Sequence, residues 1–150
     1  MKTFKTLDQL AACAGQDITV TDWYAVTQQH IDQFADATDD HQWIHVDPER
    51  AKAGPFGTTI AHGYLTLSML AGFFDRSISV QGVRMGINYG LNKVRFMAPV
   101  PSGSRLRVQV KLLSATPIEG GMQMAWHCTI EREGSDKPVC VAESLSRYYV

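Results

Sequence analysis

The sequence predicts an α+β fold in which an antiparallel sheet covers one buried helix. Residues 61–74 are apolar on every face of a helix, and such a helix must be enclosed by other parts of the chain. Residues 105–113 and 122–131 alternate apolar and polar side chains, as strands with one face in the core do. Because short turns separate the strands, we expect neighbouring strands to pair antiparallel and the helices to gather on one side of the sheet.

The first part of the chain predicts small elements followed by a long connection. Residues 7–14 have the apolar spacing of a helix, and residues 18–24 alternate like a strand. Thr27 can cap a second helix, because its hydroxyl can accept a hydrogen bond from the first helical turn. Residues 39–59 contain several prolines and glycines, so we expect an ordered loop with one helical turn opening at Pro48. A loop of this length inside a folded domain is usually functional or disordered, and its aromatic side chains argue against disorder.

The second part predicts the remaining strands. Residues 83–97 and 138–150 are also strand-like, and turns are expected at 99–103, 117–121 and 133–137. The sheet should therefore contain about five strands.

Composition limits the classes of function. A chain of 150 residues without repeats or linkers predicts one domain, residues 1–150. The formal net charge is −1 and no basic run occurs, which argues against a nucleic-acid partner. Cys13, Cys128 and Cys140 are odd in number and contain no C-x-x-C pair, which favours reduced thiols in the cytoplasm. We find no signal peptide and no apolar stretch long enough to span a bilayer, so we expect no membrane association.

Asp40 and His45 form the first candidate site. A carboxylate and an imidazole five residues apart in a loop can share one water molecule and act on it as general acid and base. The spacing fits equally well an aspartate in a local turn and a hydrogen-bonded, partly buried histidine. A further alternative is a metal site made from His41 and His45 with Asp36 or His62, although these residues do not have a recognised metal-binding spacing.

His62 and Gly63 open the apolar helix and form the second candidate site. The first N–H groups of a helix have no partner within it, and Gly63 has no side chain to block a ligand, so its N–H can stabilise an oxyanion. Gly63 can instead serve only close packing between helix and sheet. Ser68 lies further along the same helix, where a serine often bonds to the backbone of its own helix rather than joining a site.

A family resemblance joins these candidates. The chain resembles the MaoC-like (R)-specific enoyl-CoA hydratases, in particular the subgroup that includes nodulation protein N. The motifs that carry the resemblance are Asp40-x-x-x-Ile44-His45-Val46-Asp47-Pro48-x-x-Ala51, Gly54-Pro55-Phe56-Gly57, Ile60-Ala61-His62-Gly63 and Tyr89-Gly90-x-x-x-Val94-Arg95-Phe96-x-x-Pro99-Val100, within about residues 20–115. The resemblance implies a hot-dog fold, in which a sheet wraps around one long central helix.

The resemblance also implies roles for single residues. It places the family's aspartate on Asp40, its histidine on His45, its oxyanion-hole glycine on Gly63 and a supporting serine on Ser68. The usual motif has asparagine and proline where this chain has Gln42 and Trp43. Residues that we expect to contact the substrate are Trp43, His62 and, from their charge, Arg84, Lys93 or Arg95 at the phosphates of coenzyme A.

The reaction implied is the reversible hydration of a trans-2-enoyl-CoA to the (R)-3-hydroxyacyl-CoA. We expect no metal and no cofactor other than the coenzyme A that the substrate carries, and, because relatives of this fold form dimers, a homodimer. Two alternatives stay open at this point: a hot-dog thioesterase that hydrolyses the thioester, and a non-catalytic domain that binds acyl thioesters.

Overall fold

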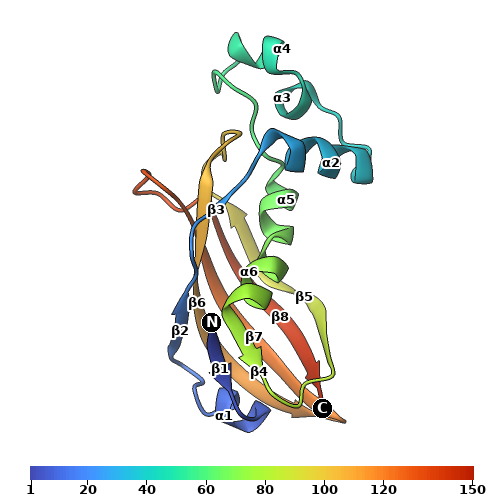
Figure 1. Ribbon diagram of the computed structural model, residues 1–150, viewed down its shortest axis with the longest axis vertical. Helices are drawn as coiled ribbons and strands as arrows, with labels where there is room; N and C mark the ends of the chain where they lie inside the picture. Colours follow the sequence, from blue (N-terminus) through green and yellow to red (C-terminus); the bar gives the residue numbers. More distant parts are fainter.

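The main sheet wraps around a central helical segment. In the computed structural model, which describes residues 1–150, this sheet has six strands. They are β2 (Asp17–Val20), β3 (Tyr24–Ala25), β5 (Met85–Phe96), β6 (Arg105–Ile118), β7 (Gly121–Arg132) and β8 (Cys140–Tyr149). The order is β2-β6-β7-β8-β5, with β3 also paired to β6, and every pairing is antiparallel. The predicted α+β class and the hot-dog fold are confirmed (Figure 1).

The alternation in β6 and β7 fixes the face of the sheet that lies in the core. Val110 of β6 pairs with Cys128 of β7, and side chains at every second position point toward the central helices. The buried side chains of these two strands are Leu106, Val108, Val110, Leu112, Met122, Met124, Trp126, Cys128 and Ile130. Each of them belongs to the apolar set that the sequence pattern predicts.

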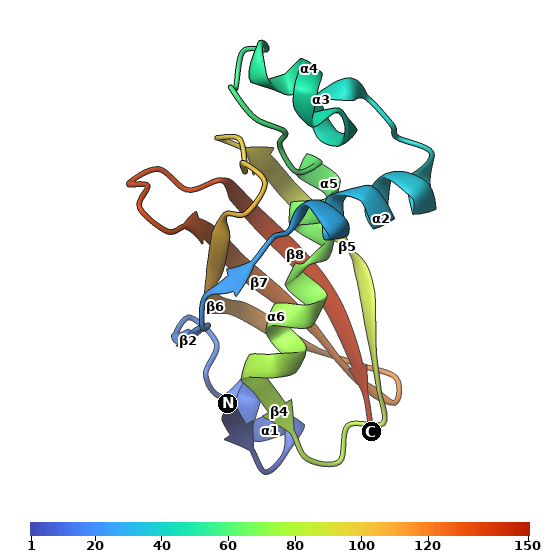
Figure 2. The ribbon, with the colours of Figure 1, turned by 45° about the horizontal axis from the view of Figure 1, so that its top comes forward.

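The central segment consists of α5 (Gly63–Ser68) and α6 (Leu70–Ser77), separated at Met69. Figure 2 shows the two helices following one another in front of the sheet. The prediction that this segment is buried on all sides is wrong for the single chain. One stripe of the helices is exposed, at the spacing of a single helix face: Tyr64, Ser68, Ala71 and Asp75. The reason is that the sheet of one chain covers only the opposite side of the helices.

Three short helices lie at one end of the molecule, above α5 (Figure 1). They are α2 (Gln28–Thr38), α3 (Trp43–Val46) and α4 (Pro48–Lys52). Thr27 caps α2 as predicted, because its side chain accepts the His30 N–H while His30 bonds back to the Thr27 N–H. Pro48 opens α4 as predicted, whereas α3 replaces part of the expected loop.

The opposite end holds the N-terminal elements. The helix α1 (Leu7–Ala11) lies next to a two-stranded parallel pair of β1 (Lys2–Phe4) and β4 (Ile78–Val80), which the sequence pattern did not predict. The strand expected over residues 18–24 is split into β2 and β3, because the Thr21 hydroxyl accepts the Val108 N–H between them. The turn expected at 117–121 is shorter, because β6 extends to Ile118.

All three cysteines are free, as the sequence predicts, and burial raises the pKa of the Cys128 thiol to about 12 and that of the Cys140 thiol to about 11. No helix in the structure combines the length and the apolar character needed to cross a membrane.

Candidate active site

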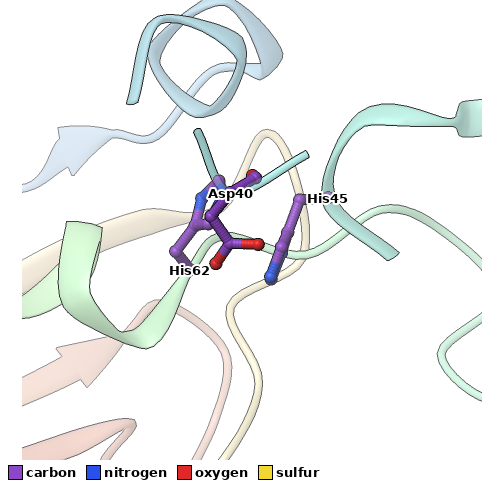
Figure 3. Close-up of side chains that lie close together, drawn as sticks. All are labelled: Asp40, His45 and His62. Atoms are coloured by element: carbon purple, nitrogen blue, oxygen red, sulfur yellow. The ribbon is translucent and has the colours of Figure 1, made fainter. Parts of the chain in front are cut away.

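Asp40, His45 and His62 converge at the end of the molecule where the short helices cover α5. One nitrogen or oxygen atom of each side chain lies within 4.8 Å of the others, and the three side chains point toward one another (Figure 3). Asp40 follows the C-terminus of α2, His45 belongs to α3, and His62 is the residue before α5. The predicted proximity of Asp40 and His45 is therefore present, with His62 as a third member.

His45 is held as a neutral base. Its side chain is buried, and its Nδ1 lies 2.7 Å from the carbonyl oxygen of Ile60. Because a carbonyl oxygen only accepts hydrogen bonds, Nδ1 carries the proton and Nε2 keeps a free lone pair. Burial lowers the pKa of His45 below its ordinary value; the nearby His62 lowers it further, and the Ile60 carbonyl and the Asp40 carboxylate oppose this change.

His62 supports the other two residues rather than facing an open pocket. Its ring stacks on the His45 ring, with centroids 3.8 Å apart and 25° between the planes. Its Nε2–H donates to the backbone oxygen of Asp40 over 2.9 Å, which fixes the segment carrying the carboxylate. Its Nδ1 is buried without a partner. The structure therefore gives His62 a contact with both predicted catalytic residues, but does not place it at the cavity wall where a substrate contact was expected.

The ring geometry is unfavourable for a metal ion. An imidazole binds a metal in the plane of its ring, and one ion cannot lie in the planes of two rings stacked 3.8 Å apart. His41, which belongs to the alternative metal set, instead pairs with Asp36 on the surface over 2.8 Å. The arrangement is better suited to acid–base chemistry on a water molecule.

Gln28 ties together the backbone around His45. Its side-chain amide donates to the backbone oxygen of His45 over 2.7 Å and to Asp32 over 2.9 Å. Its amide oxygen accepts the hydroxyl of Thr59 over 2.6 Å. One side chain of α2 thereby connects α3 with the segment that leads into α5.

A cavity of about 330 Å³ opens beside His45. Its wall includes His45, Phe56, Gly63, Thr66 and Phe96. The Gly63 N–H begins α5 and donates to no protein group, and no side chain caps this helix. A Cβ atom at Gly63 would lie 3.1 Å from the Phe96 ring. Gly63 therefore has both predicted features, a free N–H at the cavity and close packing.

Ser68 and Trp43 lie elsewhere than expected. The Ser68 hydroxyl donates to the backbone oxygen of Tyr64 over 2.7 Å, the local bond that was the alternative for this residue. Ser68 lines a separate cavity of about 920 Å³, and its hydroxyl bonds neither to Asp40 nor to His45. The Trp43 ring packs under the Arg50 guanidinium at 4.4 Å and against Gly54, so it supports the contact between α3 and α4.

The three cations predicted to bind phosphate do not lie together. Lys93 and Arg95 are exposed on β5, near the end of the strand where Phe96 meets the cavity. Arg84 lies before the other end of β5, roughly 40 Å from Phe96 along the extended strand. Within one chain, only Lys93 and Arg95 are near the site.

Three contributors were missed by the sequence analysis: the Ile60 carbonyl, Gln28 and Thr66. A backbone carbonyl leaves no trace in a sequence, and Gln28 reaches His45 only through the tertiary fold. Thr66 had a detectable signal, because it lies three residues after Gly63 on a predicted helix and so shares its face.

Comparisons with known proteins identify the family of the chain. Residues 9–127 match the MaoC-like domain family. The chain is 54% identical over 99% of both sequences to 3-hydroxyacyl-thioester dehydratase Z of Mycobacterium tuberculosis. It is 46% identical to nodulation protein N of Rhizobium leguminosarum bv. viciae, covering 88% of this chain and 84% of that protein.

A solved structure gives the same fold at lower sequence identity. The unliganded R-hydratase of Pseudomonas aeruginosa superposes with a TM-score of 0.71 at 22% identity, covering 91% of this chain and 81% of that one. This structural likeness shows a shared fold, whereas the sequence matches show membership of the family. The resemblance seen in the sequence motifs is thereby confirmed, and the chain belongs to the MaoC-like dehydratase family.

Proposed function

We propose that this protein catalyses the reversible addition of water to a trans-2-enoyl thioester of coenzyme A, giving the (R)-3-hydroxyacyl thioester. The observation that carries this proposal is the pairing of a buried, neutral His45 with Asp40 beside a cavity that presents an unused N–H of Gly63. The relative at 54% identity is a 3-hydroxyacyl-thioester dehydratase, which supports the reaction class, and the structural neighbour is an R-hydratase, which supports the stereochemistry.

In the hydration direction, Asp40 and His45 hold one water molecule between them. His45 Nε2 takes a proton from the water as its oxygen bonds to the β-carbon of the enoyl group. The electrons of the double bond move toward the thioester, and Asp40 helps to return one proton to the α-carbon. The product gains the elements of one water molecule, and neither side chain is consumed.

Negative charge develops on the thioester oxygen during the addition. The Gly63 N–H donates to no protein group, so it can donate to this oxygen without first breaking another hydrogen bond. His45 and Gly63 line the same cavity, and Asp40 lies next to His45, so one substrate can present its β-carbon to the pair and its thioester oxygen to the Gly63 N–H. The reaction requires no cofactor other than the coenzyme A of the substrate, whose phosphates Lys93 and Arg95 can meet.

A crotonyl-CoA assay tests the proposal. We expect loss of the enoyl absorbance without release of free thiol, and an (R)-3-hydroxybutyryl product on chiral analysis. Release of thiol would instead indicate a thioesterase. No reaction over a series of acyl-chain lengths, with retained binding, would indicate a domain that only binds acyl thioesters.

A further inference from the structure

Thr66 carries an unused hydroxyl inside the protein. The residue is 2% exposed, and its Oγ1 atom has no hydrogen-bond partner. A buried hydroxyl without a partner destabilises the fold, and native proteins rarely contain one without a reason.

Thr66 belongs to the wall of the cavity that holds His45 and Gly63. Thr66 follows Gly63 by three residues in α5, so the two lie on one face of the helix. Side chains of a helix lean toward its N-terminus, and the Thr66 side chain therefore covers the turn that begins with the free Gly63 N–H.

Ser68 of the same helix shows how a hydroxyl can be satisfied by the backbone of its own helix, whereas the Thr66 hydroxyl makes no such bond. The Ser68 hydroxyl donates to the carbonyl of the preceding turn over 2.7 Å, which satisfies it within the helix. The carbonyl available to Thr66 in the same way is that of His62, and this carbonyl accepts only the Thr66 backbone N–H. The Thr66 hydroxyl therefore has no hydrogen-bond partner within the protein.

We propose that Thr66 is a catalytic residue whose hydroxyl donates a hydrogen bond to the thioester carbonyl oxygen, next to the Gly63 N–H. This inference rests on the proposed function, since the oxygen in question is the one that gains charge during hydration. A hydroxyl at this position strengthens its bond as the charge grows, so it lowers the barrier more than it tightens binding of the ground state.

The kinetic test compares Thr66→Val with Thr66→Ser. Valine keeps the volume and removes the hydroxyl, so kcat for crotonyl-CoA should fall by roughly tenfold to a hundredfold. Serine keeps the hydroxyl and should retain most of the rate. The melting temperature of Thr66→Val should equal or exceed that of the wild type, because an unpaired buried polar group has been removed. Unchanged kcat in Thr66→Val, or a melting temperature that falls with valine and recovers with serine, overturns the inference.

A binding test separates this inference from the proposed reaction. Butyryl-CoA is saturated and cannot be hydrated, and S-butyl-CoA lacks only its carbonyl oxygen. We expect the wild type and Thr66→Ser to bind the thioester more tightly than the thioether. In Thr66→Val, the ratio of the two dissociation constants should be roughly tenfold smaller. A wild type that prefers the thioester but hydrates no enoyl thioester would refute the reaction and leave the Thr66 contact standing. An equal preference in wild type and Thr66→Val would refute the contact alone.

Discussion

His45 combines two properties at the scale of a single residue. Its Nδ1–H is committed to the Ile60 carbonyl, so the ring cannot turn and Nε2 stays free of protons. Its burial keeps the ring neutral near pH 7, because the pKa is lowered. A base that is already deprotonated and already oriented needs no rearrangement before it takes a proton from water.

The first prediction concerns the pair itself. Asp40→Asn keeps the shape but removes the carboxylate, and His45→Gln removes the titratable ring. Each should lower kcat by about two to four orders of magnitude with little change in KM. Because both act on one water molecule, the double variant should be scarcely slower than either single one.

The control for Asp40→Asn is the preceding aspartate. Asp39 has φ of 58°, a conformation that asparagine also adopts readily, so Asp39→Asn should fold and keep the wild-type rate. Full activity of Asp40→Asn, or losses that simply multiply in the double variant, would show that the two residues do not share one water molecule.

The second prediction is the pH dependence of kcat/KM, which reports the free enzyme. Neutral His45 is the active form in hydration, so the rate falls as the pH drops through the pKa of His45. Since burial lowers this pKa, the acid limb should lie below pH 6.5. A crotonyl thioester of pantetheine should be used, because it has no phosphate that titrates in this range. An acid limb centred above pH 6.5 would contradict the assignment of His45 as a buried base.

At the scale of elements, α5 serves two purposes. Gly63 and Thr66 line the cavity, whereas Tyr64 and Ser68 belong to the exposed stripe on another side of the helix. Its first turn is uncapped, unlike that of α2, where Thr27 satisfies the helix end. The start of α5 therefore has N–H groups that no side chain of the protein satisfies.

The third prediction tests this end of the helix. Gly63→Val places a side chain between the N–H and the cavity and presses on the Phe96 ring, so kcat should fall by roughly a hundredfold or more. Gly72→Ala is the matched control, because its new Cβ atom meets only the flexible end of Arg76 on α6. Melting curves of both variants distinguish loss of fold from loss of rate. A folded Gly63→Val protein with nearly normal kcat would exclude Gly63 as the oxyanion donor.

Elements with a repeating pattern could be predicted from the sequence, and the site only in part. The alternation in β6 and β7 identified each buried side chain there, and Thr27 and Pro48 marked real helix starts. The parallel pairing of β1 with β4 was missed, because it joins residues 76 positions apart and each strand has only three residues. The site spacing and the family motifs pointed to Asp40 and His45. The assignment of Ser68 failed, because its position in the sequence does not show which face of the helix meets the cavity.

At the scale of the whole molecule, one side of the chain remains uncovered. The strand β5 is an edge of the sheet and exposes Met85, Ile87, Tyr89 and Leu91. All of these side chains except Met85, and all of the exposed stripe of α5 and α6 except Tyr64, line the cavity of about 920 Å³. Apolar side chains on an open sheet edge favour pairing with another chain.

The fourth prediction is a two-fold homodimer whose sheets continue through β5. Light scattering at micromolar concentration should give twice the chain mass of 16.6 kDa. The double variant Ile87→Lys, Leu91→Lys should shift the protein toward monomer, whereas Val20→Lys on the opposite edge strand β2 should not. A monomeric wild type would refute the prediction.

The hydrogen bonds made by Gln28 bear on how the protein loses activity when it is heated. The proposed catalytic groups lie within residues 40–66, whereas the largest fully buried side chains, such as Trp126, belong mainly to the sheet. The Gln28 amide joins α2 to the His45 backbone, and hydrogen bonds of His45 with Ile60 and of His62 with Asp40 hold the same region. We expect the short helices to open locally on heating while the sheet remains intact, so that inactivation precedes global melting.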